Sequence, residues 1–540
     1  MESCAMRHRF PVLLFIFAIA AGSSCSDKPQ SGISAQTEPP RVIRRGNGGE
    51  PGSLDPAIAE DVHAFNILTD LYEGLVTVSA AGEIVAGVAE TWVVSDDGLT
   101  YVFQLRKSAK WSNGEALVAQ DFVRSFQRLA DPLTGSAYSF LIEDIAHFSA
   151  IQSGEAEANQ LAVTATGSHT LQIVLERRVP YFISILTMPV ALPVYARDLD
   201  SVVASSPDDF VGNGAFVLSA HTPEGELTIR KNAHYWDASS VAVDEVVYVP
   251  IIDPGTELNV YRAGQLDITN PIPPTHVQMV SSDLPGHVQI APTLALYYLA
   301  FDVTEAPLDS RELRLALSMA IDRNTIVSVT GRGESPAYGV VPPGVFNYDG
   351  ADDPASQLSK DEREAQAREY YRRAGYSSDN PLHLQLTYDS GDIHERIAVA
   401  VSSMWRDVLG VDFDLRKMEW QYFLDTRENR ANWQVMRFAW TGDYNDATTF
   451  TNIFRSHDLQ NLSGYSNPDY DDILSKAAAE GDTTRRAEQI ATAERILLND
   501  QPIAPLYFYV SKHLVRPSLE GYQQNVLDRH PSKYLRIQSK

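Results

Sequence analysis

Cysteine is almost absent from this 540-residue sequence, whose 2 cysteines, Cys4 and Cys25, both lie near its beginning. Beyond them the chain has no residue that could form a disulfide, a cysteine-based metal site or a thiol nucleophile. An oxidising compartment would therefore do the rest of the chain no harm.

Long hydrophobic runs are also scarce, and the main one is Pro11–Gly22. At about a dozen residues it is shorter than the ~20 that a bilayer-spanning helix needs, and basic residues precede it. We therefore predict that residues 1–25 are an export signal. The stretch from Gly22 to Cys25 is similar to a lipobox, which predicts a lipid anchor on Cys25, with ordinary cleavage nearby as the alternative. The polar residues 26–40 show no periodicity and are expected to form a flexible tether.

Positive charge is in short supply: Lys+Arg number 44 against 70 for Asp+Glu, a net charge of -26. Such an acidic chain argues against nucleic acid or an anionic membrane surface as its main partner. The composition, 44% hydrophobic and 21% charged, is that of a globular protein. The length favours two to four compact units.

Catalytic motifs are missing as well. The sequence contains no G-x-x-x-x-G-K-[ST] phosphate loop and no G-x-S-x-G elbow. The segment beginning at His394 starts like a zinc-protease helix, but Ala398 stands where the second histidine is required. We therefore predict no enzymatic activity, no cofactor and no metal. A secreted hydrolase whose carboxylates come from distant segments remains the alternative.

What the sequence does contain is an alternation of strand-like and helix-like segments without internal repeats. Period-two alternation predicts strands over residues 99–106, 383–389 and 504–515. Helical periodicity predicts helices over residues 118–132, 310–329, 360–376, 394–410 and 484–500. The expected fold class is α/β.

Eight blocks, one of them Asp443–Asp446, then resemble, in the same order, the oligopeptide-binding members of family 5 of the extracytoplasmic solute-binding proteins. The other seven are Gly87–Pro132, Gly212–Leu218, Lys231–Asp237, Tyr261–Thr269, Leu315–Val327, Trp420–Arg427 and Pro505–Val510. The resemblance extends from about Arg41 to the C-terminus. It implies a bilobed periplasmic-binding-protein clamshell (type II, cluster C) with an extra subdomain. On that fold, lobe 1 comprises residues 41–72, 190–293 and 511–540, the subdomain 73–189, and lobe 2 294–510.

The resemblance also implies a function. Members of the family bind short peptides as extended chains outside the cytoplasm and deliver them to a membrane ABC permease. The implied partners are therefore short peptides and that permease, the implied state is a monomer, and the implied location is the periplasm or cell envelope. Dipeptides, murein peptides or metal complexes are alternative ligands on the same fold. A sensory or adhesive surface protein is an alternative of another class.

Site residues follow by carrying over the family's positions. Asp443 matches the aspartate that pairs with the peptide ammonium, and Arg437, His394 and Arg332 match residues near the peptide carboxylate. Further pocket contacts map to Glu60, Tyr138, Tyr261, Trp420, Arg427, Trp440 and Tyr509. Ala300 and Thr293 depart from the family pattern at positions expected in side-chain pockets.

Each of the charged positions also has a simpler interpretation. Asp443 could be an exposed turn residue, and Arg437 an edge-strand cation that keeps neighbouring chains away. His394 could merely begin the helix that follows it, where a cation is poorly placed against the helix dipole.

Overall fold

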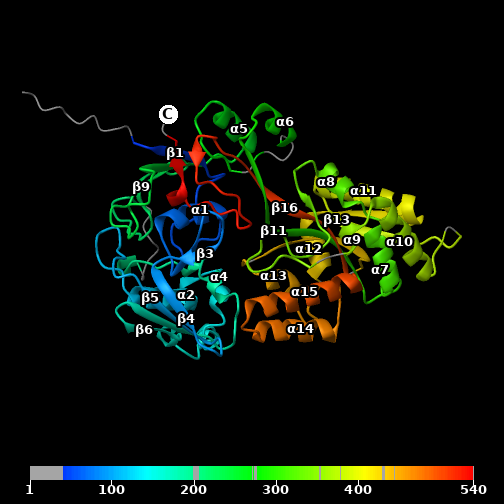
Figure 1. Ribbon diagram of the computed structural model, residues 1–540, viewed down its shortest axis with the longest axis horizontal. Helices are drawn as coiled ribbons and strands as arrows, with labels where there is room; N and C mark the ends of the chain where they lie inside the picture. The colour runs from blue at the N-terminus through cyan, green and yellow to red at the C-terminus, as the bar shows by residue number, and fades with distance from the viewer. Residues whose placement is uncertain are drawn as a thin grey trace, which may run out of the picture. The chain divides into compact units, whose positions relative to one another are not determined.

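The computed structural model describes residues 40–198, 206–270, 272, 277–351, 354–377, 379–428, 432–442 and 444–538, drawn in Figure 1. Residues Pro40–Lys540 form one compact unit. The predicted export signal, Cys25 and nearly all of the tether lie outside the described residues. None of the helices in the described ranges has the length and apolarity needed to cross a membrane.

A six-stranded sheet forms the centre of the C-terminal half. Its strand order is β12-β16-β11-β15-β13-β14. The strands are β11 (Val288–Phe301), β12 (Ser335–Pro336), β13 (His383–Asp389), β14 (Asp412–Met418), β15 (Val435–Thr441) and β16 (Ile503–Leu514). Strand β13 runs parallel to both β14 and β15, whereas β11 is antiparallel to β15 and β16. The predicted strands 383–389 and 504–515 are confirmed.

Helices cover both faces of this sheet, as Figure 1 shows. One hydrophobic cluster joins the sheet to α7 (Arg311–Met319), α8 (Arg323–Thr330), α10 (Lys360–Arg373) and α11 (Asp392–Leu409). A second cluster joins it to α12 (Trp420–Glu428), α13 (Thr448–Thr451), α14 (Pro468–Ala479) and α15 (Thr483–Asp500). Because successive strand residues point to opposite faces, neighbouring residues of one strand enter different clusters. The short α9 (Pro354–Gln357) also belongs to this half.

The prediction of a single helix over residues 310–329 is wrong, because the segment forms two helices, α7 and α8. The Asp322 side chain accepts a hydrogen bond from the Asn324 backbone N–H and so begins a new helix. Leu313, Leu317 and Ile326 enter the same cluster. The apolar pattern therefore continues across a break that contains neither Gly nor Pro.

The N-terminal half contains two four-stranded sheets that share one hydrophobic cluster. The first has the order β1-β10-β9-β8 and the second β4-β5-β7-β6. The first consists of β1 (Val42–Gly46), β8 (Phe216–His221), β9 (Leu227–Lys231) and β10 (Glu245–Val249), and the second of β4 (Ala89–Val94), β5 (Thr100–Leu105), β6 (Val163–Gly167) and β7 (Thr170–Val174). The remaining elements are β2 (Val76–Val78), β3 (Ile84–Ala86), β17 (Leu519–Glu520), β18 (Arg536–Ile537), α1 (Val62–Leu71), α2 (Ala119–Ala130), α3 (Phe148–Gln152), α4 (Phe182–Ile185), α5 (Pro254–Arg262) and α6 (Val277–Asp283). Strand β5 and helix α2 confirm the predictions for residues 99–106 and 118–132.

The two long strands β11 and β16 connect the halves. They pair from Val288 opposite Leu514 to Ala300 opposite Ile503. One end of the pair belongs to the six-stranded core, whereas Leu514 packs in a separate cluster with α5 and α6. The lobe boundaries predicted near residues 293 and 511 fall on these strands, and they stay a prediction.

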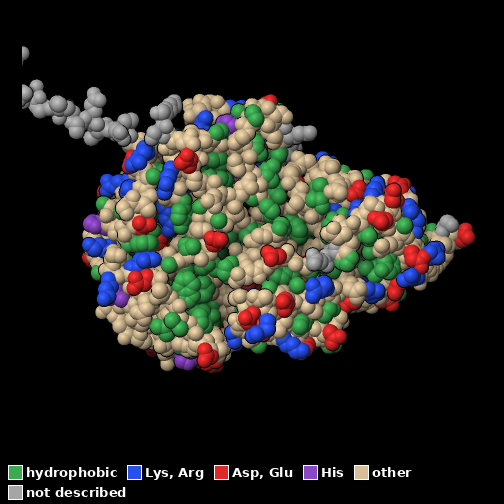
Figure 2. Space-filling model, viewed as in Figure 1, with side chains coloured by type: hydrophobic (Ala, Val, Ile, Leu, Met, Phe, Trp, Pro, Cys, Tyr) green, Lys and Arg blue, Asp and Glu red, His purple; other side chains and the backbone are tan. Residues whose placement is uncertain are grey.

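Figure 2 shows acidic and basic side chains interspersed over the face that it presents. On this face the net negative charge is therefore not gathered into one patch.

Candidate functional site

Arg437 lies in the middle of the six-stranded sheet rather than at an edge. It belongs to β15, which is hydrogen-bonded to β11 on one side and β13 on the other, and it is 8% exposed. Its Nε and Nη2 donate to the Asp389 carboxylate, whose side chain is equally buried. The interpretation of Arg437 as an edge-strand cation is therefore wrong.

Asp389 and His394 flank the loop between β13 and α11. Asp389 is the last residue of β13, and the loop places His394 in the first turn of α11. A Cβ atom on Gly391 would lie 2.7 Å from His394 Cδ2, so only glycine lets the imidazole lie this close to the loop. Ligand sites of α/β sheets are commonly found at the carboxyl ends of parallel strands, which is the position of this loop.

The His394 imidazole packs against a buried tyrosine. The ring lies parallel to that of Tyr297, 5.6 Å between centroids, and its Nδ1 is 3.2 Å from the Tyr297 hydroxyl. Its Nε2 is 3.8 Å from Asp389 Oδ2. Burial, with the nearby Arg437 guanidinium, lowers the pKa of His394 to about 4. At neutral pH the imidazole is therefore uncharged.

Positive charge exceeds negative charge around this group. Arg332 is half-buried and acts electrostatically on His394 and Lys512. Among the described residues, no ion pair joins Arg332 to a carboxylate, whereas Lys512 Nζ lies 3.6 Å from Glu334 Oε1. Among the described residues, this neighbourhood holds the three cations Arg437, Arg332 and Lys512 and the two carboxylates Asp389 and Glu334. The resulting excess of one positive charge suits an anionic ligand such as a carboxylate.

Aromatic rings line the same neighbourhood. Tyr509, on β16, lies 6.4 Å from Tyr297 between ring centroids and 5.2 Å from Tyr507. Burial raises the pKa of Tyr509, which keeps its hydroxyl protonated as a hydrogen-bond donor. The site therefore combines charged groups with aromatic walls, as small-ligand pockets do.

Trp440 and Arg427 lie on the other face of the sheet. Because β15 alternates, Trp440 points away from Arg437 and packs against the cluster that contains Phe438. Its indole Nε1 is buried and has no acceptor among the described residues. Arg427 lies on α12 and acts electrostatically on Tyr298. Trp420 begins α12, but its side chain lies outside the described residues.

A cavity of about 190 Å³ opens at the end of β15. Gly442 and Tyr444 line it, and so do Thr293 and Arg529. Asp443 itself lies outside the described residues, and its neighbours on both sides face this space. Thr293 lines this cavity, and its role in a ligand pocket stays a prediction. Ala300 is 2% exposed within a hydrophobic cluster, so its expected pocket role is wrong.

Three predicted pocket residues lie in other surroundings. Glu60 is exposed before α1, and Tyr138 packs edge-on against Phe65 at 5.9 Å. Tyr261 is buried on α5, with its hydroxyl 2.7 Å from His287 Nδ1. The structure therefore brings Arg437, His394, Arg332 and Tyr509 together and leaves these three apart from that group.

Sequence reasoning missed Asp389 and Tyr297, which hold Arg437 and His394 in place. The available signal was the strand ending at Asp389 five residues before His394, a strand–loop–helix unit with charged residues at the loop. The residues Asp389 and Arg437 are 48 positions apart in the chain, so no local sequence pattern predicts that they pair.

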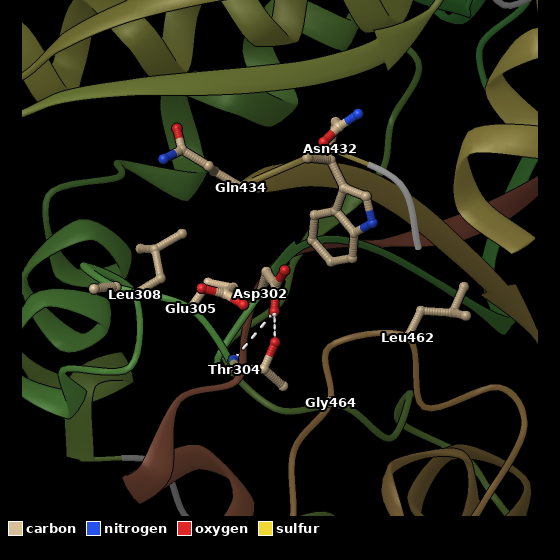
Figure 3. Close-up of a pocket in the computed structure, with 10 residues that line it drawn as sticks. Asp302, Thr304, Glu305, Leu308, Asn432, Gln434, Leu462 and Gly464 are labelled. Carbon is tan, nitrogen blue, oxygen red and sulfur yellow. Dashed lines mark hydrogen bonds between the residues drawn. The ribbon is translucent and has the colours of Figure 1, made fainter. Parts of the chain in front are cut away.

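A separate cavity of about 400 Å³ is lined by Asp302, Glu305, Trp433 and neighbouring residues (Figure 3). Asp302 Oδ1 accepts hydrogen bonds from the Thr304 backbone N–H at 3.1 Å and from its hydroxyl at 2.6 Å. That carboxylate therefore closes a local turn. None of the predicted site residues lines this cavity.

The low pKa of His394 predicts a pH-dependent stability. In the unfolded chain the imidazole takes up a proton near its ordinary value of 6.5, and in the folded protein only near 4. The unfolded state therefore binds more protons between these values, so the free energy of unfolding is retained above pH 6.5 and falls as the pH drops to about 4. The loss from this residue is about 3 kcal/mol. Urea titrations of His394→Gln should show a shallower decline than the unmodified protein, and an equal decline would contradict the prediction.

Comparison with known proteins places the chain in a family. Residues 83–461 match the family described as bacterial extracellular solute-binding proteins, family 5. The periplasmic murein peptide-binding protein of Escherichia coli K12 is 38% identical over 480 residues, covering 88% of this chain and 89% of that protein. The periplasmic oligopeptide-binding protein of Salmonella typhimurium LT2 is 34% identical over 516 residues, 94% of each.

A solved structure agrees with these matches. The unliganded open form of a periplasmic murein tripeptide-binding protein superposes with a TM-score of 0.89 at 37% identity, covering 92% of this chain and 97% of that one. The fold is accordingly the bilobed α/β fold of periplasmic binding proteins. The chain belongs to family 5 of the bacterial extracellular solute-binding proteins.

Proposed function

We propose that this protein captures short peptides outside the cytoplasmic membrane and delivers them to an ABC permease. Family membership supports this proposal, and so do the relatives, which are a murein peptide-binding protein and an oligopeptide-binding protein. We propose no chemistry for the chain itself. In this scheme the binding energy stabilises a closed state that the permease recognises.

The observation that carries the proposal is the charge excess around Arg437. A peptide carboxylate added to Arg437, Arg332 and Lys512 would bring the group, with Asp389 and Glu334, to neutrality. His394, uncharged at neutral pH, would contribute a hydrogen bond and no charge. Every free peptide ends in a carboxylate, so this contact would accept peptides of any sequence without reading their side chains.

Asp443 is proposed to hold the ammonium group at the other end of the peptide. The family position supports this role, as does its place between Gly442 and Tyr444, which line the cavity at the end of β15.

The variant Asp443→Ala tests this assignment. Loss of an enclosed charge-assisted contact costs about 1.5–3 kcal/mol, so calorimetry should show an affinity for a free tripeptide at least tenfold lower. An N-acetylated tripeptide is the matched control. Because it has no ammonium group, the unmodified protein and the Asp443→Ala variant should bind it with similar affinity. Equal affinity of both proteins for the free tripeptide would remove Asp443 from the site.

Murein peptides are a second candidate ligand, favoured by the 38% identity to a murein peptide-binding protein. Competition calorimetry between a murein tripeptide and trialanine distinguishes the two ligand classes. We further propose that the protein is a monomer in the periplasm and that a lipid on Cys25 anchors it to a membrane.

A further inference from the structure

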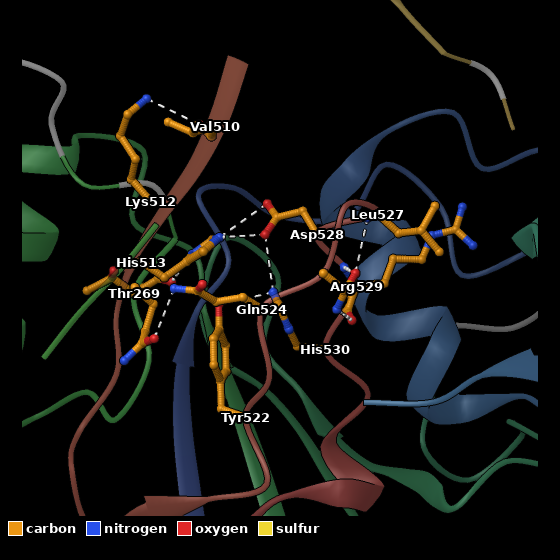
Figure 4. Close-up of polar contacts among 12 residues, drawn as sticks. Thr269, Val510, Lys512, His513, Tyr522, Gln524, Leu527, Asp528, Arg529 and His530 are labelled. Atoms are coloured by element: carbon orange, nitrogen blue, oxygen red, sulfur yellow. Dashed lines mark hydrogen bonds and ion pairs between the residues drawn. The ribbon is translucent and has the colours of Figure 1, made fainter. Parts of the chain in front are cut away.

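A compact polar cluster lies where the C-terminal segment crosses the end of β16. It is next to residues of the proposed peptide site, because Lys512 precedes His513 and Arg529 lines the cavity beside Asp443. His513 is on β16, while Asp528 and His530 lie on the crossing segment (Figure 4). The side chains of His513 and His530 are 9% and 6% exposed, and that of Asp528 is 32% exposed. The carboxylate therefore opens a route from solvent to two buried imidazoles.

The hydrogen bonds fix the tautomer of His513. Its Nδ1 is 2.9 Å from the Thr269 backbone carbonyl, which can only accept, so Nδ1 carries a hydrogen. In a neutral imidazole the other nitrogen, Nε2, then presents a lone pair. That lone pair points at the Asp528 carboxylate, 2.9 Å from Oδ1 and 3.1 Å from Oδ2.

His530 approaches the same carboxylate from the other side. Its Nε2 is 3.2 Å from Asp528 Oδ1 and 3.0 Å from the Tyr522 hydroxyl. If the tyrosine donates to this nitrogen, a second lone pair faces the carboxylate. Figure 4 shows both imidazoles directed at one carboxylate group. A cation between these electron-pair donors, either a proton on one imidazole or a metal ion, makes the arrangement favourable.

The spacing of the three donor atoms fits a metal ion. All three lie within 4.8 Å of one another. Transition-metal bonds to histidine nitrogen and carboxylate oxygen are about 2.0–2.2 Å long, which places neighbouring ligand atoms about 2.9–3.5 Å apart. The observed separations of 2.9 and 3.2 Å between Asp528 Oδ1 and the two Nε2 atoms lie in this range. The Thr269 carbonyl supplies the outer hydrogen bond that typically orients a metal-binding imidazole.

We propose that His513, Asp528 and His530 bind a divalent transition-metal ion such as Zn²⁺. Two imidazoles and one carboxylate are a donor set that suits zinc, cobalt and nickel rather than calcium or magnesium. The ion would tie the crossing segment to β16. This segment also packs into the six-stranded core through Val526 and receives a hydrogen bond at the His530 carbonyl from Arg45. Metal binding should therefore stabilise the junction between the two halves.

Metal titration of the full chain, produced without a histidine tag and stripped with EDTA, tests the proposal. Co²⁺ should bind with one equivalent per chain and give the visible absorption of an ion with nitrogen ligands. Zn²⁺ should displace it and raise the melting temperature. The variants His513→Ala, Asp528→Asn and His530→Gln should each weaken Co²⁺ binding at least tenfold.

The matched control is His383→Ala, which removes an exposed histidine whose Nε2 lies 3.0 Å from Asp414 Oδ2. This variant should bind Co²⁺ like the unmodified chain. Should His513→Ala not fold, the two milder substitutions still decide the question. Absence of stoichiometric Co²⁺ binding would overturn the proposal, because the cluster would then hold only a proton on His513. Binding that survives both Asp528→Asn and His530→Gln would overturn it equally.

Discussion

Replacing Arg437 by Met in a chain that also carries Asp389→Asn is expected to weaken the binding of a free tripeptide at least a hundredfold. Arg437 is buried and held by Asp389, so its charge acts on a ligand carboxylate in a setting that is poorly screened by water. Truncating one member of a buried charge pair at an interface costs about 2–5 kcal/mol, and a hundredfold change is about 2.7 kcal/mol. Calorimetry at pH 7 measures the change.

The double variant is needed because Arg437 has two roles. Removing the guanidinium alone would leave the Asp389 carboxylate buried without its partner, which destabilises proteins by about 3–5 kcal/mol and would confuse folding with binding. Replacing both members by neutral residues of similar size avoids that penalty. Asp389→Asn alone keeps Arg437 for the ligand but leaves its charge buried without Asp389, so its free energy of unfolding is measured beside its affinity; it should bind the tripeptide more tightly than the double variant does.

A peptide with an amidated C-terminus identifies the contact. The unmodified protein should bind the amide far more weakly than the free acid, and the double variant should bind both alike. A double variant that still prefers the free acid would assign the carboxylate to other residues. Arg332 would then be the first candidate, because the described contacts give it no carboxylate partner.

Local sequence patterns predicted the strands and helices that carry this site. They predicted the contacts within the site less well. The strand ending at Asp389 follows from alternation along residues 383–389, and the helix after it from a stripe of buried apolar residues that includes Ile397, Val401 and Trp405. Both are properties of a few consecutive residues. The break between α7 and α8 was not predicted from the sequence. Apolar residues of both helices pack in one hydrophobic cluster, and the helices are separated by a side-chain cap rather than by Gly or Pro.

The site itself depends on pairings between distant segments. Family position indicated Arg437 and His394. The strand that ends five residues before His394 marks Asp389 as a residue at the loop, but nothing in the sequence near Arg437 shows that Asp389 pairs with it from the neighbouring strand. Burial is equally non-local: Ala300 is enclosed because β15 and β16 flank it, with Met436 and Ile503 opposite. A resemblance transfers residue positions, whereas the charge balance around them emerges only when the strands are side by side.

The largest effect on stability is expected at Glu73, where the predicted subdomain begins. Its carboxylate accepts hydrogen bonds from Lys533 Nζ at 2.7 Å, from the Tyr235 hydroxyl at 2.5 Å and from Trp236 Nε1 at 2.5 Å. The Glu73 and Lys533 side chains are 3% and 13% exposed. This cluster explains the Tyr235-Trp236 pair in one of the family-like blocks, because both residues are donors to one buried carboxylate.

Glu73→Ala should therefore lower the free energy of unfolding by about 3–5 kcal/mol, because it leaves the Lys533 ammonium buried without an anion. Urea denaturation at pH 7 measures this loss. The double variant Glu73→Gln with Lys533→Met should recover most of it, since no buried charge remains. Lys476→Met, which removes an exposed pair with Asp472, is the control and should leave the midpoint unchanged. If the double variant were no more stable than Glu73→Ala, the loss would come from packing around Tyr235 rather than from the stranded charge.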